Sequence, residues 1–299
     1  MIASVLPREQ TVRAADGRAL HVIEDGDREG FPVLVHHGTP GAAEPFHRSW
    51  VDDADARGIR LIGYDRPGYG GSDADPGRSV ADAAEDARTI ADALGLERLA
   101  TWGESGGGPH ALACAALIPE RLTAAAILCS PAPFDADGLD WFAGQAQDNV
   151  DEHETALKGA DPLRRLLGPA RQEMLAAEPE QMREGLGSLL SDVDSELVTG
   201  EVAAFLLAGI HNGLAPGLDG WVDDDLAFVS PWGFDPAQAG AVPVLLLHGA
   251  HDNFVPPSHA RWLAERIPGV QAQVSDADGH LTLTMRRVPE VHAWLTRQR

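Results

Sequence analysis

Short apolar runs alternate with helical segments along most of this chain, and that alternation limits the fold more than any other feature of the sequence. The runs are PVLVH at 32–36, RLIGY at 60–64, LATWG at 99–103, TAAAILC at 123–129 and VPVLLL at 242–247. Apolar runs of this length, bounded by turns, are typical of strands that are buried on both faces. The segments between them show helical spacing, most clearly over 79–94 and 106–118. The pattern predicts an α/β fold in which helices cover both faces of a mostly parallel sheet.

The alternation is interrupted once. The stretch from 135 to 237 contains helical segments at 162–167, 172–177 and 201–210 and no clear strand. The pattern then resumes with a helix expected at 258–267, a strand at 271–274 and a last helix at 289–297. We therefore predict a core formed by residues 1–134 and 238–299, with residues 135–237 inserted as a helical cap.

The chain is strongly acidic, and its acidity is concentrated in the predicted cap. The 299 residues include 46 Asp or Glu and 23 Lys or Arg, for a formal net charge of −23. Residues 131–240 hold 21 of the acidic residues and five of the basic ones. Nucleic acids and anionic membrane surfaces attract basic patches, so we expect neither as a partner. We expect a cap with a negative outer surface. The run Asp223-Asp224-Asp225 could repel anionic substrates or attract amines, but we place it on the solvated face.

The sequence carries no sign of export or of membrane insertion. The first ten residues lack a charged stretch followed by a long apolar one, so no signal peptide is expected, and no segment approaches 18 consecutive apolar residues. Cys114 and Cys129 lie in apolar runs without C-x-x-C spacing, which favours small buried side chains in a reducing compartment. We therefore expect a cytoplasmic location.

The sharpest local motif is GESGG at 103–107, which matches G-x-S-x-G and lies between a predicted strand and a predicted helix. A serine at such a junction sits on a strained turn that raises its hydroxyl above the sheet edge. The start of the following helix supplies positive potential to a developing oxyanion. We therefore predict that Ser105 is a nucleophile.

A nucleophilic serine needs a general base and an acid that orients the base. His280 follows the strand expected at 271–274, in a loop at the sheet edge where the catalytic groups of α/β folds gather. Asp252 follows the run VPVLLL in the same way, and the chain order Ser105, Asp252, His280 is the one expected for this motif. Asp135, just after the run TAAAILC, is the alternative acid.

Two backbone N–H groups are expected to bind the oxyanion. One belongs to the residue after the nucleophile, Gly106, and the other comes from the loop after an early core strand. That loop is HGTPG at 37–41, and because Pro40 has no N–H group, we assign the second donor to Thr39.

No metal or cofactor is expected. The histidines at 36, 37, 248 and 251 match no ligand spacing of a metal site. The glycine-rich motifs that bind phosphates or dinucleotides are absent or incomplete.

With these motifs in place, the chain resembles the α/β-hydrolase superfamily. The matching segments are HHGTPG at 36–41, DRPGYGGSD at 65–73, GESGGG at 103–108, HGAHDNFVP at 248–256 and DGH at 278–280. The resemblance implies an eight-stranded, mostly parallel sheet with the active site between core and cap. The nearest subgroup looks like the capped hydrolases with an HGxPG loop, which include prolyl aminopeptidase-like enzymes and small esterases. The peptidases of that subgroup usually carry an aromatic residue after the nucleophile, where this chain has Gly106.

The expected activity is that of a serine hydrolase that cleaves a small to medium carboxylic ester, lactone or amide through an acyl-serine intermediate. Glu104 beside the nucleophile and Trp141, His211 and Trp221 of the cap are candidate substrate-binding residues, although the cap aromatics would equally pack its interior. Two other classes stay open on the same scaffold. One is a non-hydrolytic enzyme, such as a lyase, a cyclase or a perhydrolase-type haloperoxidase, and the other is a non-enzymatic receptor for a small molecule.

Overall fold

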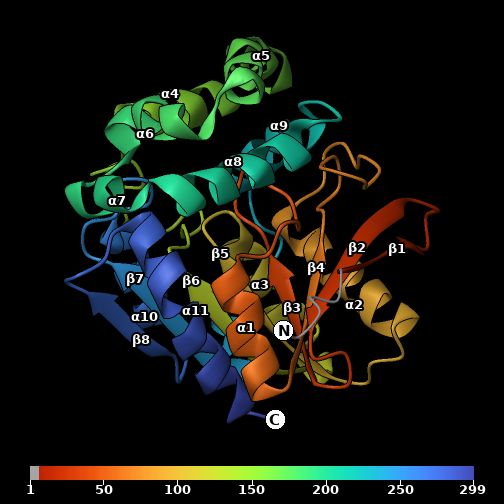
Figure 1. Ribbon diagram of the computed structural model, residues 1–299. Helices are drawn as coiled ribbons and strands as arrows, with labels where there is room; N and C mark the ends of the chain where they lie inside the picture. Colours follow the sequence, from red (N-terminus) through yellow and green to blue (C-terminus); the bar gives the residue numbers. More distant parts are fainter. Residues whose placement is uncertain (1–6) are drawn as a thin grey trace.

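The computed structural model describes residues 7–299, and these residues form an eight-stranded sheet (Figure 1). The strands are β1 (Arg8–Arg13), β2 (Ala19–Gly26), β3 (Phe31–His36), β4 (Ile59–Tyr64), β5 (Leu99–Glu104), β6 (Leu122–Leu128), β7 (Val244–Gly249) and β8 (Gln271–Ser275). Their order across the sheet is β1-β2-β4-β3-β5-β6-β7-β8. The β1–β2 and β2–β4 pairs are antiparallel, and all later pairs are parallel. The predicted eight-stranded, mostly parallel sheet is confirmed.

Helices cover both faces of the sheet, as the alternating pattern predicts. The helices α1 (Arg48–Arg57) and α11 (His280–Thr296) pack on one face and lie in front of the sheet in Figure 1. The helices α2 (Ala83–Ala93), α3 (Gly107–Leu117) and α10 (Pro257–Arg266) pack on the other. The strands alternate apolar side chains between these two layers: Val33 and Val35 of β3 contact the α1/α11 layer, and Leu34 contacts the α3 layer.

The central helix α3 is buried along almost its whole length. Its residues from Gly107 to Ala116 are all buried, and Gly, Ala and Cys make up most of them. Small side chains let a helix approach the sheet closely, so the end of β5 and the start of α3 are joined by a very tight turn. That turn holds the GESGG motif.

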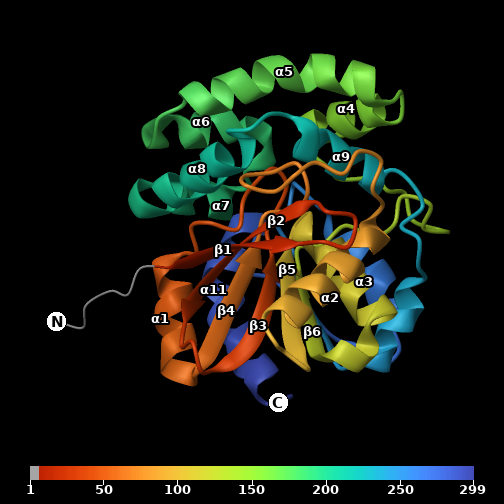
Figure 2. The same ribbon diagram turned by 90° about the vertical axis from the view of Figure 1, so that its right-hand side faces the viewer.

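Six helices follow one another between β6 and β7 in the sequence, and they form a separate layer of the structure. They are α4 (Gln147–Ala156), α5 (Ala160–Ala176), α6 (Met182–Leu186), α7 (Asp192–Leu197), α8 (Gly200–Leu214) and α9 (Asp219–Phe228). Both views place them together above the ends of the strands, on the side away from the C-terminus (Figures 1 and 2). We refer to residues 135–237 as the cap; the domain boundaries at 134/135 and 237/238 stay a prediction.

Two helices differ from the sequence expectation because they continue through a proline. The last helix begins at His280 rather than at Pro289, and α5 runs as one helix past Pro169 where two shorter segments were expected. A proline inside a helix removes one hydrogen bond and clashes with the preceding turn. Burial of Leu283, Val288 and Leu295 against the sheet offsets that cost in α11.

The edge strand β1 and the helix α1 were not expected from the sequence. The strand REQTVR is mostly exposed and pairs only with β2, so it lacks the apolar run that identifies buried strands. No helix within residues 7–299 is long and apolar enough to cross a membrane. The signal-peptide expectation concerns the chain start, and residues 1–6 lie outside the described part.

Candidate active site

Ser105 sits at the junction of β5 and α3 with a left-handed backbone, at φ 50°. This conformation costs a residue with a side chain about 1–2 kcal/mol, so the surrounding structure must hold it in place. The Ser105 N–H donates to the carbonyl of Leu128 at 2.8 Å, and the Ser105 carbonyl accepts from the N–H of Gly108 at 3.0 Å. Gly103 has no room for a side chain, because a Cβ there would lie 2.2 Å from the carbonyl oxygen of Gly107. The strained turn is therefore fixed from the strand side and from the helix side.

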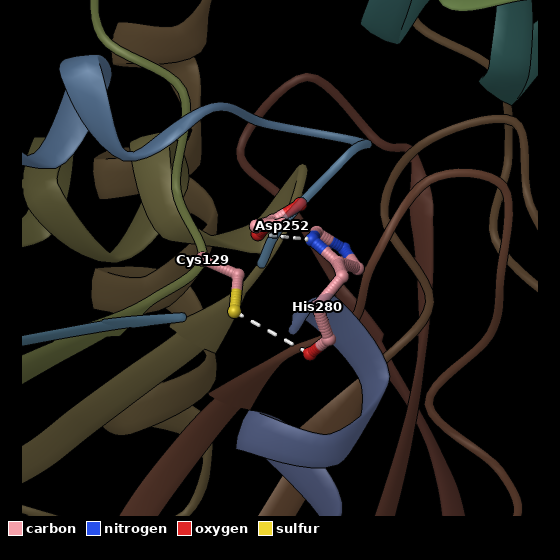
Figure 3. Close-up of side chains that lie close together, drawn as sticks. All are labelled: Cys129, Asp252 and His280. Carbon is pink, nitrogen blue, oxygen red and sulfur yellow. Dashed lines mark hydrogen bonds and ion pairs between the residues drawn. The ribbon is translucent and has the colours of Figure 1, made fainter. Parts of the chain in front are cut away.

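His280 and Asp252 are hydrogen-bonded to each other in the buried region near this turn (Figure 3). The distance between His280 Nδ1 and Asp252 Oδ2 is 2.7 Å. Asp252 Oδ1 accepts the backbone N–H groups of Phe254 at 2.9 Å and Val255 at 2.8 Å. A carboxylate only accepts hydrogen bonds, so Nδ1 carries the proton and Nε2 of His280 is left free to act as a base.

The environment of His280 favours its charged form. Burial alone would lower the pKa of the imidazole, but the negative charges of Asp252, Asp194 and Glu104 more than offset it, and the pKa is raised above its ordinary value. The ring of Phe254 stacks on the imidazole, with ring centres 4.4 Å apart, and so limits the rotation of His280.

Cys129 lies beside this pair at the end of β6 (Figure 3). Its Sγ donates to the backbone carbonyl of His280 at 3.4 Å. Burial, together with the nearby negative charges, raises the pKa of the thiol well above its ordinary range, so it stays protonated. Within residues 7–299, one group of side chains has its possible ligand atoms close enough together to hold a metal ion, and it consists of Cys129, Asp252 and His280. None of the histidines at 36, 37, 248 and 251 belongs to that group. A protonated thiol is a poor metal ligand, and the Nδ1 of His280 is already hydrogen-bonded to Asp252.

Thr39 and Gly106, the two residues assigned to an oxyanion hole, lie against each other. A Cβ at Gly106 would be 2.2 Å from Thr39 Oγ1 and 3.0 Å from Cζ of Phe228. The position after Ser105 therefore admits no side chain. Gly38 packs on the other side, where its Cβ position is 3.6 Å from that of Ser105.

A buried carboxylate of the cap holds this loop in place. Asp224, on α9, is fully buried and forms salt bridges with Arg66 at 2.6 Å and Arg78 at 2.7 Å. Its Oδ2 also accepts the hydroxyl of Thr39 at 2.5 Å. Arg66 in turn donates to the carbonyls of His37 and Gly38. The cap, the DRPGYG turn and the HGTPG loop thus meet at one ion pair network.

The aspartate run at 223–225 is therefore not on a solvated face, and that expectation was wrong. All three side chains are buried. Burial by itself would raise the pKa of Asp224, but the two guanidinium groups hold it well below its usual range. The sequence alone does not reveal this burial, because Arg66 and Arg78, the cationic partners of Asp224, lie more than 140 residues away in the sequence.

A cavity of about 270 Å³ lies between the core and the cap. Its lining brings together Ser105, His280, Thr39 and Gly106. The cap side is mostly apolar and includes Met174, Met182, Leu186, Phe205, Leu206 and Ile210. A largely apolar cleft with a few convergent polar groups is the common form of a small-molecule site.

The other residues singled out in the sequence divide into two groups. Glu104, Trp141 and Trp221 line the cavity. His211 does not, because its Nε2 bonds to the carbonyl of Met174 and ties α8 to α5, so its assignment as substrate-binding is corrected. Asp135 is exposed and lies outside this cavity, so the structure brings Asp252, and not Asp135, to His280.

Two further cavity residues form a carboxyl pair on the cap wall: Glu152, which the sequence did not single out, and Asp225, which belongs to the run expected on a solvated face. Glu152 of α4 and Asp225 of α9 interact directly. Trp221 Nε1 donates to Glu152 Oε1 at 2.8 Å, and Asp225 Oδ2 is buried without a hydrogen-bond partner among the described residues. Burial raises the pKa of both carboxyls, and the neighbouring Glu152 raises that of Asp225 further. Two carboxyls in direct interaction titrate together, so uptake of a proton is a property of the pair rather than of either residue.

Comparison with known proteins identifies the family. Residues 32–284 match the family model of the alpha/beta hydrolase fold. This chain belongs to that family. A relative of this α/β hydrolase, the proline iminopeptidase of Xanthomonas citri, is 27% identical over 298 residues, covering 92% of each chain. A non-heme chloroperoxidase of Streptomyces lividans is 34% identical over 125 residues, which are 41% of this chain and 45% of that protein. The structure of a thermophilic esterase from Thermogutta terrifontis has the same fold, with a TM-score of 0.64, 22% identity and coverage of 98% of this chain and 99% of that one.

The Asp224 network makes a stability prediction for this α/β hydrolase. Replacing Asp224 by Ala leaves two buried guanidinium groups without their counter-charge, and we expect a loss of about 3–5 kcal/mol in the free energy of unfolding. Asp219→Ala is the matched control on the same helix, because Asp219 is half-exposed and its ion pair among the described residues is with the partly exposed Arg164, so its loss should be below about 1 kcal/mol. Urea unfolding measures both. Similar losses in the two variants would contradict the role of Asp224.

Proposed function

We propose that this α/β hydrolase is a serine hydrolase in which Ser105, His280 and Asp252 form a catalytic triad. The observation that carries the proposal is the strained, left-handed Ser105 opening on the same cavity as a histidine whose Nδ1 is bonded to a buried aspartate. Such a constellation activates a hydroxyl that is otherwise a weak nucleophile. The proposed substrate is a small to medium carboxylic ester, lactone or amide, bound as a small molecule in the cavity.

In the first half-reaction the Ser105 oxygen attacks the acyl carbon. His280 Nε2 takes the hydroxyl proton, and Asp252 stabilises the imidazolium that forms. The negative charge on the substrate oxygen is bound by the backbone N–H groups of Thr39 and Gly106. When the tetrahedral intermediate collapses, the bond to the leaving group breaks, and His280 returns the proton to that group.

In the second half-reaction a water molecule attacks the acyl-serine. His280 removes a proton from the water, the same two N–H groups bind the oxyanion, and the proton passes back to the Ser105 oxygen as the acid is released. The cap covers the cavity and limits the access of bulk water during these steps.

A covalent probe tests the nucleophile. We expect a fluorophosphonate to label the protein at Ser105 and we expect Ser105→Ala to abolish both the label and the hydrolysis of short-chain p-nitrophenyl esters. If the probe labels a residue other than Ser105, or labels nothing in the folded protein, the serine-hydrolase proposal is wrong. Labelling of Ser105 without turnover of esters, lactones or amides would favour the non-hydrolytic classes, and hydrogen peroxide as acyl acceptor then tests the perhydrolase class.

The pH profile tests the role of Asp252. His280 acts as a base only when neutral, so kcat/KM should fall as the pH drops through its raised pKa. Asp252→Asn removes the charge that raises this pKa and the group that fixes the tautomer. We expect kcat to fall by about 10³–10⁴-fold and the acidic limb to move to lower pH. An acidic limb unchanged in Asp252→Asn would contradict the assignment.

We also propose that the substrate carries a protonated amine, because the cap wall of the cavity presents the Glu152–Asp225 carboxyl pair. No arginine or lysine lines the cavity among the described residues. Burial lowers the pKa of the lining histidines His37 and His153 to about 3 and about 4, so both are neutral. An ammonium group would supply the missing counter-charge, and the name of the Xanthomonas citri relative, a proline iminopeptidase, agrees with an aminoacyl substrate.

Glu152→Gln tests the amine. For an aminoacyl ester with a free amine we expect kcat/KM to fall about 10- to 100-fold, which corresponds to the loss of a charge-assisted hydrogen bond. For the same ester without the amine, we expect kcat/KM to change less than about threefold. Glu154→Gln, an exposed neighbour on α4, is the matched control and should leave both rates unchanged. Equal losses for the two substrates in Glu152→Gln would contradict recognition of an amine.

A further inference from the structure

One aspartate of the cap reaches into the helix that carries His280. Asp194 lies on the short helix α7 and is fully buried. The helix α11 begins at His280, so the first backbone N–H groups of α11 have no partner within the helix itself. Asp194 supplies that partner from a different part of the chain.

Four donors converge on the Asp194 carboxylate. Oδ2 accepts the backbone N–H of His280 at 2.8 Å and the hydroxyl of Ser191 at 3.0 Å. Oδ1 accepts the backbone N–H of Thr282 at 2.8 Å and the Thr282 hydroxyl at 2.9 Å. Because all four contacts are donated to it, an amide side chain could not replace this carboxylate without placing donor against donor.

The approach of Asp194 leaves no space around the residue before His280. A Cβ at Gly279 would lie 2.3 Å from Asp194 Oδ2 and 2.5 Å from the hydroxyl of Ser191. The Gly279 N–H in turn donates to the Thr282 hydroxyl at 2.7 Å. The glycine of the DGH segment is therefore matched to a carboxylate of the cap, and the backbone position of His280 depends on both.

Asp194 also acts on the charge of His280. None of the described basic side chains forms an ion pair with Asp194, so the carboxylate has the helix N-terminus and the nearby imidazole as its only positive neighbours. The other groups that face His280 are Asp252 and His248 from the β7 side, Glu104 from β5 and Cys129 from β6. Asp194 is the member of this set that belongs to the cap.

We propose that Asp194 is a positioning residue for His280, through which the cap fixes the place and the charge of the group that transfers the proton. The inference rests on the proposed function of His280 as the general base. Its consequence is that His280 is correctly placed only when α7 is seated on the core. The cap is then part of the catalytic machinery as well as its cover.

The test compares Asp194→Asn with Asp192→Asn. Both variants remove one negative charge from α7, but Asp192 is exposed and stands outside this contact. For Asp194→Asn we expect kcat/KM to fall about 10- to 100-fold, the range known for small displacements of a reacting group. We expect the pKa of His280, followed by NMR of the imidazole, to fall, because a nearby negative charge is lost. Asp192→Asn should match the parent protein in both.

Two results would overturn the inference. One is a folded Asp194→Asn protein with kcat/KM within about twofold of the parent, and the other is a rate loss with the pKa of His280 unchanged, which a purely packing role would give. If Asp194→Asn does not fold, Thr282→Val decides, since it removes one donor to Asp194, together with the acceptor of the Gly279 N–H, and keeps the charge. We then expect a loss of about fivefold, and a rate within about twofold of the parent overturns the inference.

The proposed function is checked separately. Fluorophosphonate labelling of Ser105 in the parent protein tests it before any variant is compared. The NMR titration of His280 needs no substrate, so a protein that hydrolyses nothing would still show whether Asp194 sets the pKa of this histidine.

Discussion

The structure depends on a single buried charge, the carboxylate of Asp224, which lies between Arg66 and Arg78. An ion pair at this depth gains little stability over an apolar replacement, because each charge has lost its water. It does set position, since the guanidinium of Arg66 also holds the carbonyls of the HGTPG loop and Asp224 holds the Thr39 hydroxyl. The strained serine, the loop beside it and the cap above them are located relative to one another by this network.

The acidity of the cap therefore has two parts. Most of its carboxyl groups face solvent and account for the low isoelectric point. A few point inward, and each has a different environment: Asp224 pairs with two arginines, Asp194 accepts hydrogen bonds from the start of α11, and Glu152 and Asp225 interact with each other. Of these inward carboxyls only Glu152 and Asp225 line the cavity, and so they are the ones that bear on the choice of substrate.

Short sequence patterns predicted the features of this molecule that depend on residues close together in the sequence. The buried strands, the turn at Ser105 and the places of Asp252 and His280 follow from apolar runs, glycines and the rule that parallel strands end at one edge. What failed was long-range: the sequence cannot show that Arg66 reaches an aspartate 158 residues away, so residues 223–225 read as a solvated face. His211 failed for the same reason, because its partner is a carbonyl on another helix. Pro289 misled because tertiary packing outweighs the local cost of a proline.

The contacts of Asp194 and Asp224 bear on how such a protein can change over time. A cap inserted in a loop between two strands is the kind of unit that can be lengthened, shortened or exchanged without disturbing the sheet. Here two of its carboxylates end inside the core, one at the start of the helix bearing His280 and one at the loop bearing Thr39. A cap taken from another protein would have to supply both carboxylates at the same places, so sequence changes in the cap and in the core must occur together.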